Sequence, residues 1–175
     1  ETVEARLSKC IKQAQSGDKD AKKLSDLLGR YKAVLEQGKS CRTVALQNPE
    51  EEAMSHDLFL LTNKPVMYVC NVDDASAAKG NKYVDAVRDA VKDENAEILI
   101  IAAKTESEIA EIESYDDRQM FLDELGLKES GVVRLIQSAY HLLNLETFFT
   151  AGADECRAWT INKGDKAPRA AGVIH

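Results

Sequence analysis

The sequence lacks the features that mark membrane-spanning, secreted and metal-clustered proteins. No apolar run approaches the roughly 20 residues that cross a bilayer, and no secretory signal opens the chain. No pair of cysteines has C-x-x-C spacing, and no pair of histidines has H-x-x-x-H spacing. We therefore expect no membrane association, no metal site, and unpaired thiols in a reducing, cytoplasmic compartment. The residues in question are Cys10, Cys41, Cys70, Cys156, His56, His141 and His175.

Charge is abundant and unevenly spread. Hydrophobic residues make up 44% of the 175 residues and charged residues 30%, which is typical of one ordinary globular domain or two small ones. The net charge of −7 argues against indiscriminate binding to nucleic acid. Residues 1–40 carry nine basic against six acidic side chains. This excess could favour an anionic partner, although the solvated surface of a helical hairpin explains it equally well.

Residues 1–47 are predicted to form a coiled-coil helical hairpin. Apolar residues recur three and four apart on both sides of Ser16-Gly17-Asp18, which suits the end of one helix and the cap of the next. Such a seam is about two residues wide per turn, too narrow for a globular core, so we expect the hairpin to project from a body or to pack on one. The seam residues are Val3, Leu7, Cys10 and Ala14, then Ala21, Leu24, Leu28, Tyr31 and Leu35.

Residues 48–144 are predicted to form part of an α/β domain with a parallel sheet. Residues 66–70 and 98–101 are continuous apolar strands that do not alternate, as expected where both faces of a sheet are covered. A helical face over residues 83–91 lies between them, which predicts a parallel pair joined by a right-handed crossover. Two strands are too few to complete such a domain.

Further helices are expected on both sides of these strands. Asn48 is followed by proline and three glutamates, the pattern of a helix start, and this helix should run to about residue 61. Ser114 opens another helix that ends near Gly126, and apolar residues over 132–143 predict a third.

Residues 145–175 are predicted to begin a separate small domain. Residues 148–150 and 157–161 read as paired strands, residues 162–165 as a turn, and a helix begins at Ala167.

Two polar loops follow the carboxyl ends of the predicted parallel strands, at the sheet edge where such folds bind ligands. Asn71 can donate and accept hydrogen bonds, Asp74 can receive the ring N–H groups of a purine, and small alanines let backbone N–H groups approach. Asparagine and aspartate are also the commonest turn formers, so a plain turn and a base pocket both stay open. The loops consist of Asn71, Val72, Asp73 and Asp74, and of Ala102, Ala103 and Lys104.

Three stretches resemble one known family. LTNKPVMYVCNVDD (61–74), ESEIAEI (106–112) and especially HLLNLETFFTAGADECRAWTINKGDKAPRAAGVIH (141–175) resemble the YchF family, the Obg-like ATPases. The likeness extends over essentially the whole chain: the hairpin matches that family's coiled-coil insertion, and the last stretch matches the start of its TGS domain, a β-grasp fold. The resemblance implies a central-to-C-terminal portion of a cytoplasmic P-loop protein of the GTPase fold. It further implies hydrolysis of ATP in preference to GTP with Mg²⁺, association with the large ribosomal subunit, and a role linked to translation and redox state.

The same resemblance implies roles for the two polar loops. Residues 71–74 fall on the base-recognition motif, which is N-K-x-D in ordinary GTPases and N-x-x-E in this family, and residues 102–104 fall on the second base-contact loop, which resembles S-A-K. Val72 replaces the lysine whose stem would cover the base, and Asp74 replaces the glutamate of the family. Guanine offers two N–H donors to such a carboxylate, whereas adenine presents a ring acceptor. Since one misplaced charged hydrogen bond costs about 1.5–3 kcal/mol, we expect ATP to be accepted and discrimination against GTP to be modest.

A phosphate-binding loop is absent, because G-x-x-x-x-G-K-[S/T] occurs nowhere in the sequence. Without it the phosphates have no cradle and Mg²⁺ has no hydroxyl ligand, so we expect no cofactor on this chain alone and no hydrolysis by it. The chain starts at Glu1 without a methionine, and we expect a processed, nicked or excised piece of a longer enzyme. The alternatives are a non-catalytic ribosome- or protein-binding module and an unrelated α/β domain with a structural loop, which the last 35 residues disfavour.

Other candidate residues have ordinary explanations. Trp159, with Phe148 and Phe149, could stack on RNA bases beside Arg157, but such aromatics more often form the core of a small sheet. His141 is expected on a helix face, and the acids of EIAEIESYDD are expected to be solvated near a helix start. Only the family resemblance makes Lys163, Lys166 and Arg169 candidates for contact with ribosomal RNA.

Overall fold

Two units make up the chain. The computed structural model describes residues 1–94 and 96–174. The N-terminal unit comprises Glu1–Pro65 with Val91–Asn95, and the C-terminal unit comprises Val66–Ala90 with Ala96–His175. The predicted domain boundaries after residues 47 and 144 are not tested by these units, and they stay predictions. Among the described residues, none of the helices combines the length and apolar character that a bilayer span requires.

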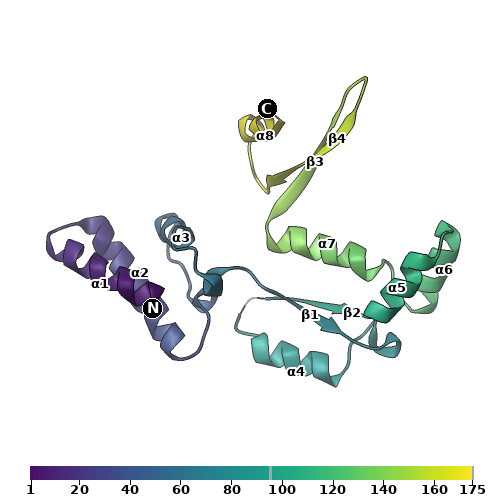
Figure 1. Cartoon of the computed structure of the whole chain (residues 1–175), viewed down its shortest axis with the longest axis horizontal. Coiled ribbons are helices and arrows are strands. Elements are labelled where there is room, and N and C mark those ends of the chain that lie inside the picture. Colours follow the sequence, from purple (N-terminus) through teal and green to yellow (C-terminus); the bar gives the residue numbers. More distant parts are fainter. Residues whose placement is uncertain (95, 175) are drawn as a thin grey trace. The chain divides into compact units, whose positions relative to one another are not determined.

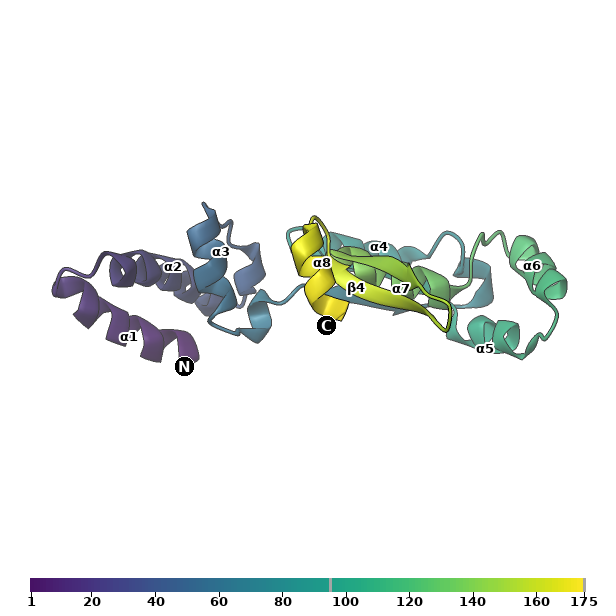
Figure 2. The same ribbon diagram turned by 90° about the horizontal axis from the view of Figure 1, so that it is seen from above.

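A helical hairpin opens the N-terminal unit, as its apolar spacing predicts. Helix α1 spans Thr2–Gln15 and α2 spans Lys19–Glu36, and both ribbon views show them side by side (Figures 1 and 2). The Asp18 carboxylate caps α2 by accepting a hydrogen bond from the backbone N–H of Asp20 at 2.9 Å. Gly17 leaves α1 with φ +97°, a left-handed conformation that glycine adopts without steric cost.

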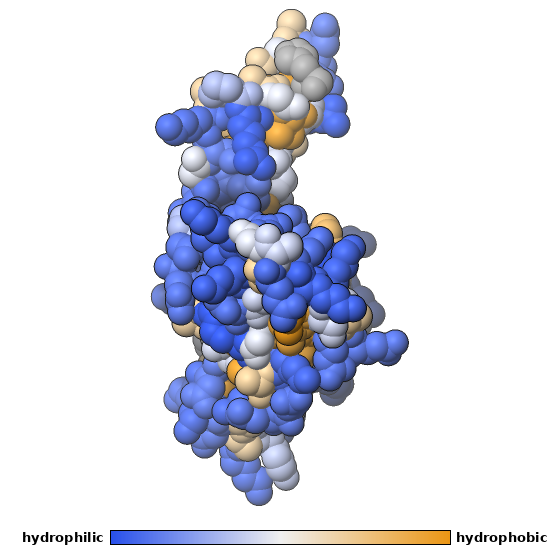
Figure 3. Space-filling model, turned by 90° about the vertical axis from the view of Figure 1, so that its left-hand side faces the viewer, coloured by the Kyte–Doolittle hydropathy of each residue, from blue (hydrophilic) through white to orange (hydrophobic). Residues whose placement is uncertain are grey.

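The hairpin does not rely on a narrow seam, because the residues that follow it complete a core. Leu27, Leu28 and Tyr31 are all 0% exposed, and Leu27 lies outside the predicted seam. Helix α3 covers them together with irregular segments on either side of it. The face of the chain shown in Figure 3 is mostly hydrophilic, with a few apolar patches. The buried cluster is Val3, Cys10, Leu27, Leu28, Tyr31, Cys41 and Leu58, with Leu7, Leu24, Leu35, Val44, Leu46, Met54 and Leu60 packed against it.

Helix α3 is shorter than its sequence predicts. It spans Pro49–His56, and the Asn48 side chain caps it as expected by accepting the backbone N–H of Glu51 at 2.9 Å. The prediction extended the helix to about residue 61. The backbone instead turns at Phe59, where φ is +51°, and then forms a 3₁₀ turn over Leu61–Asn63. A positive φ at a non-glycine residue is incompatible with a continuing helix.

A parallel pair of strands organises the C-terminal unit and confirms the predicted α/β fold. Strand β1 (Met67–Asn71) lies beside β2 (Glu97–Ile101), with Val69 opposite Leu99. Helix α4 (Lys82–Val91) forms the crossover on one side of the pair, and α7 (Gly131–Leu142) lies on the other (Figure 1).

The expectation that both strands are covered on both faces holds for β2 only, among the described residues. Leu99 of β2 is 6% exposed, whereas Val69 of β1 is 49% exposed. The physical reason is that α7 packs mainly on β2, which leaves one face of β1 open.

Two short helices follow β2, and the sequence predicted only the second. Helix α6 (Tyr115–Glu124) begins at Ser114, as expected. Helix α5 (Ala103–Glu111) was not predicted, because it contributes only two buried residues, Thr105 and Ile109, and lacks a strong apolar stripe. The two helices share a small core of Ala77, Ala102, Ile109, Leu122 and Leu127, with Val72, Phe121 and Leu125 at its margin.

The last residues form the predicted strand pair and helix. Strand β3 (Leu145–Ala151) pairs antiparallel with β4 (Cys156–Asn162), and α8 (Ala167–Ile174) packs on β4. Phe148 and Trp159 are opposite each other and half-buried, which fits a sheet core better than a free stacking platform. Phe149 points to the other face and is 77% exposed, so the core interpretation does not extend to it within the described chain.

Candidate nucleotide-base site

The two predicted base-contact segments are joined by a hydrogen bond. The Asn71 Oδ1 atom, at the end of β1, accepts the backbone N–H of Ala103 at 3.0 Å. Next to it, the Val72 N–H donates to the carbonyl of Ile101 at 2.9 Å and extends the parallel ladder by one bond. Segments 32 residues apart in the sequence therefore meet at the carboxyl edge of the sheet, where α/β folds bind ligands.

The two aspartates have different surroundings. Asp73 caps the 3₁₀ turn Asp74–Ser76, because its Oδ1 atom accepts the backbone N–H of Ser76 at 3.0 Å. Asp74 takes no part in that cap, and its carboxylate instead accepts a hydrogen bond from the Thr105 hydroxyl. The turn is therefore capped by Asp73, and the Asp74 carboxylate is available to bind a ligand.

The second segment is the beginning of a helix and not a loop, which corrects the sequence prediction. Ala102 is 2% exposed at the N-cap position of α5, and Ala103 and Lys104 form the first turn. Backbone N–H groups in a first turn have no acceptor within the helix and lie at the positive end of its dipole. The Lys104 ammonium lies 3.7 Å from Glu108 Oε1, one turn further along the helix.

Val72 has a packing role in this structure. Its side chain is half-buried against the core shared by α5 and α6. It also borders a hollow of about 400 Å³ between β1 and α4, together with Asn71, Tyr83 and Val87. That hollow is lined by Asn71 and Val72 of the first base-contact segment, but by neither Asp74 nor the start of α5.

Two residues that support the site carry no signal in the sequence. Thr105 is 1% exposed, and its hydroxyl reaches a carboxylate 31 residues away. Glu106 Oε1 accepts the backbone N–H of Gly131 at 2.7 Å, which joins α5 to the first residue of α7. A Cβ atom on Gly131 would lie 2.7 Å from Ile101 Cγ1, so only glycine fits there without rearrangement. Both contacts bridge distant segments, and local patterns do not reveal such contacts.

His141 has the surroundings that the sequence suggests, whereas the neighbouring acids match the expectation only in part. His141 lies exposed on α7, with its Nδ1 atom 2.6 Å from Glu97 Oε1. Glu108, Glu111, Glu113, Asp116 and Asp117 are all exposed, as expected. Only Asp116 and Asp117 lie in the first turn of a helix, because Glu108 and Glu111 belong to the second half of α5.

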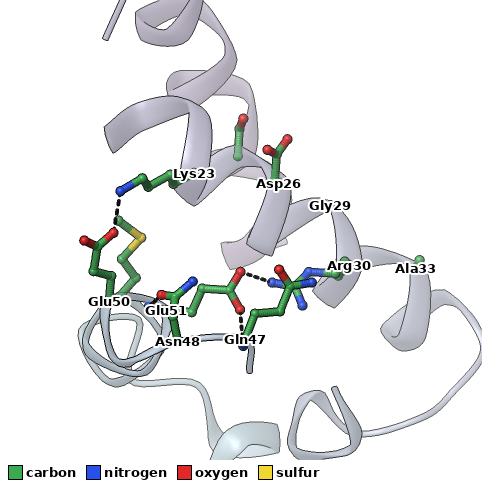
Figure 4. A pocket seen from close by; sticks show the side chains of 11 residues that line it. Lys23, Asp26, Gly29, Arg30, Ala33, Gln47, Asn48, Glu50 and Glu51 are labelled. Carbon is green, nitrogen blue, oxygen red and sulfur yellow. Dashed lines mark hydrogen bonds and ion pairs between the residues drawn. The ribbon is translucent and has the colours of Figure 1, made fainter. Parts of the chain in front are cut away.

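A separate hollow of about 750 Å³ lies in the N-terminal unit, between α2 and the start of α3 (Figure 4). Lys23 forms an ion pair with Glu50, and Arg30 forms one with Glu51. Glu51 Oε2 also accepts the backbone N–H of Gln47 at 2.9 Å. Four of the charged side chains that line the hollow thus neutralise one another, and we assign no ligand to it.

Acidification is expected to weaken the N-terminal unit through Glu51. The hydrogen bond from Arg30, and then that from Gln47, hold the pKa of Glu51 below its ordinary value of 4.5. A lowered pKa in the folded state gives stability that is complete above the ordinary value and is lost as the pH falls through the lower one. Melting temperatures measured by circular dichroism should therefore differ between wild type and Glu51→Gln near neutral pH and converge in acid.

The matched control for this experiment is Glu52→Gln. Glu52 is an exposed acid in the same first turn of α3. Its replacement should leave the pH dependence unchanged, and an equal effect of both substitutions would contradict the role assigned to the Arg30–Glu51 pair.

Sequence comparisons place this geometry in a known family. Residues 145–175 match the family model YchF-GTPase_C, described as a protein of unknown function (DUF933). The chain is 46% identical over 177 residues to the ribosome-binding ATPase YchF of Bacillus subtilis (strain 168), a match that includes 100% of this chain and 48% of that protein. It is 36% identical over 165 residues to Obg-like ATPase 1 of Rattus norvegicus, with 92% of this chain and 41% of that protein aligned.

A solved structure gives the same assignment. The Schizosaccharomyces pombe YchF GTPase superposes with a TM-score of 0.81 at 28% identity, over 99% of this chain and 48% of that one. The chain spans about half the length of the curated relatives it matches. The chain belongs to the YchF family.

Proposed function

We propose that this chain supplies the purine-recognition part of a ribosome-associated P-loop ATPase of the cytoplasm. The observation that carries the proposal is the hydrogen bond between Asn71 and Ala103, which holds the two base-contact segments together. The printed names of the relatives, ribosome-binding ATPase and Obg-like ATPase, support the activity and the partner. We further propose that the helical hairpin is the family's coiled-coil insertion and that residues 145–175 begin a TGS domain.

The donors and acceptors of the site suit a purine. Because Asn71 Oδ1 is occupied by the Ala103 N–H, the Nδ2 group is left to donate to N7, an acceptor that adenine and guanine share. The Asp74 carboxylate accepts from N–H groups at the other edge of the base. Guanine offers N1–H and N2–H₂ there, and adenine offers its N6–H₂ donor beside an acceptor nitrogen. Asn71 therefore recognises purines in general, while Asp74 is the group that distinguishes between them.

The family resemblance implies Mg²⁺ for the intact protein, and the residues that the structure describes offer no group of ligands for it. The described residues contain no cluster of three or more histidine, cysteine or acidic side chains that could hold a metal ion. The sequence also contains no G-x-x-x-x-G-K-[S/T] loop. We assign the ion to no residue here, and we propose that residues 1–175 alone do not hydrolyse ATP.

Equilibrium competition between ATP and GTP tests the proposal in the full-length protein that contains this chain. Both nucleotides should bind, with a preference below about a hundredfold, since Asp74 alters a single charged hydrogen bond. A larger preference for either nucleotide would refute the role given to Asp74.

Two further measurements separate the alternatives. Purified residues 1–175 with ATP and Mg²⁺ should release no phosphate above the blank. Turnover would refute the proposal that residues 1–175 alone do not hydrolyse ATP. A full-length protein that binds neither nucleotide but still sediments with large ribosomal subunits would favour a non-catalytic binding module.

A further inference from the structure

Thr105 has an unusual environment for a polar side chain. It is 1% exposed in the first turn of α5, and only Ser55 is a comparably buried polar residue among those described. A threonine within a helix commonly returns its hydroxyl hydrogen bond to a carbonyl of the preceding turn. The Thr105 hydroxyl instead donates to Oδ1 of Asp74, on the other base-contact segment. The hydroxyl, the only polar group of the Thr105 side chain, thus contacts the Asp74 carboxylate that would bind the base.

Asp74 needs such a partner, because little else holds its carboxylate. Asp74 is an exposed residue at the start of a 3₁₀ turn, and the cap of that turn is supplied by Asp73. An ionised carboxylate has about four acceptor positions on two oxygens. The Thr105 hydroxyl uses one of them and restricts the rotation of the group, while Oδ2 and the second lone pair of Oδ1 stay available for a base.

We propose, on the basis of the purine-binding function above, that Thr105 is a positioning residue that sets the preference between the two purines. Guanine presents two adjacent donors and needs both carboxylate oxygens in one plane. Adenine presents one donor beside an acceptor, so it needs one oxygen and tolerates a carboxylate that rotates away. The bond from Thr105 therefore favours guanine, and it makes GTP a better ligand than Asp74 alone would allow.

The test uses Thr105→Val in the full-length protein, because valine keeps the shape of threonine and removes its hydroxyl. Affinities for ATP and GTP are measured by isothermal titration calorimetry. The variant should bind GTP about three- to tenfold more weakly, since binding must now order the Asp74 side chain. Its affinity for ATP should change less than about twofold, because a single contact depends little on the carboxylate plane. Thr105→Ser, which keeps the hydroxyl, should have the wild-type ratio of GTP affinity to ATP affinity.

A second pair of variants separates positioning from packing. In the Asp74→Ala background, Thr105→Val should leave the ratio of the two affinities unchanged, because the group that it positions is gone. An equal loss for both nucleotides in Thr105→Val, or a serine variant that behaves like valine, would overturn the inference while leaving purine binding intact. A wild-type protein that binds neither nucleotide would overturn the inference and the proposed function together.

Discussion

Replacing Asn71 with alanine is expected to weaken the binding of both ATP and GTP by about ten- to a hundredfold. The substitution removes two interactions at once. It deletes the acceptor that holds the Ala103 N–H at 3.0 Å, and it deletes the proposed donor to N7. Because N7 is common to both bases, the ratio of the two affinities should stay within about threefold of the wild-type value. Competition binding with the full-length protein measures both quantities.

Asn71→Asp separates these two roles. Aspartate keeps an oxygen for the Ala103 N–H but has no N–H group to offer to the base. It should therefore lose nucleotide affinity while hydrogen exchange at the Ala103 amide stays slow. In the alanine variant, the same amide should exchange faster. Wild-type affinity in the aspartate variant would show that Asn71 only joins the two segments, and the turn interpretation of this residue would then prevail.

Much of the fold follows from local pattern. The parallel pair is predicted because residues 66–70 and 98–101 are continuous apolar runs, separated by a helical face of the right length for a crossover. The caps at Asp18 and Asn48 are predicted because each precedes a helical pattern, and both side chains accept first-turn N–H groups in the structure. These features depend on residues close together in the chain, which is where sequence patterns are informative.

The parts that escaped prediction depend on contacts across the chain. The sequence predicts a hairpin seam too narrow for a core, because the residues that complete the core, such as Val44 and Leu58, lie in irregular segments without periodicity. Helix α5 was missed because its buried side chains include a polar one, Thr105.

The candidate site was predicted only in outline. The pairing of strands brings its two segments to one edge of the sheet, and this could be predicted. Which aspartate caps the turn (Asp73) and which contacts Thr105 (Asp74) depends on turn geometry that composition does not encode.

Replacing Tyr31 with alanine is expected to destabilise the N-terminal unit by about 3–5 kcal/mol, the usual cost of removing a large aromatic ring from a core. Tyr31 is 0% exposed and lies within the cluster that joins α1, α2 and the segments around α3. Its hydroxyl is 2.6 Å from Ser55 Oγ, which also receives the side-chain N–H of Asn63. Urea unfolding followed by circular dichroism measures the loss in the helical signal.

Tyr31→Phe is the matched control, because it keeps the ring and removes only the hydroxyl. It should cost about 1 kcal/mol, since Ser55 retains its bond to Asn63. The chain's single tryptophan, Trp159, lies in the C-terminal unit, so its fluorescence reports on that unit alone. In Tyr31→Ala the helical transition should move to lower urea while the Trp159 transition stays in place. A shift of both transitions by the same amount would mean that the two units unfold as one cooperative structure. If Tyr31→Ala instead lost about as little unfolding free energy as Tyr31→Phe, the core around α2 would have to close over the space left by the ring.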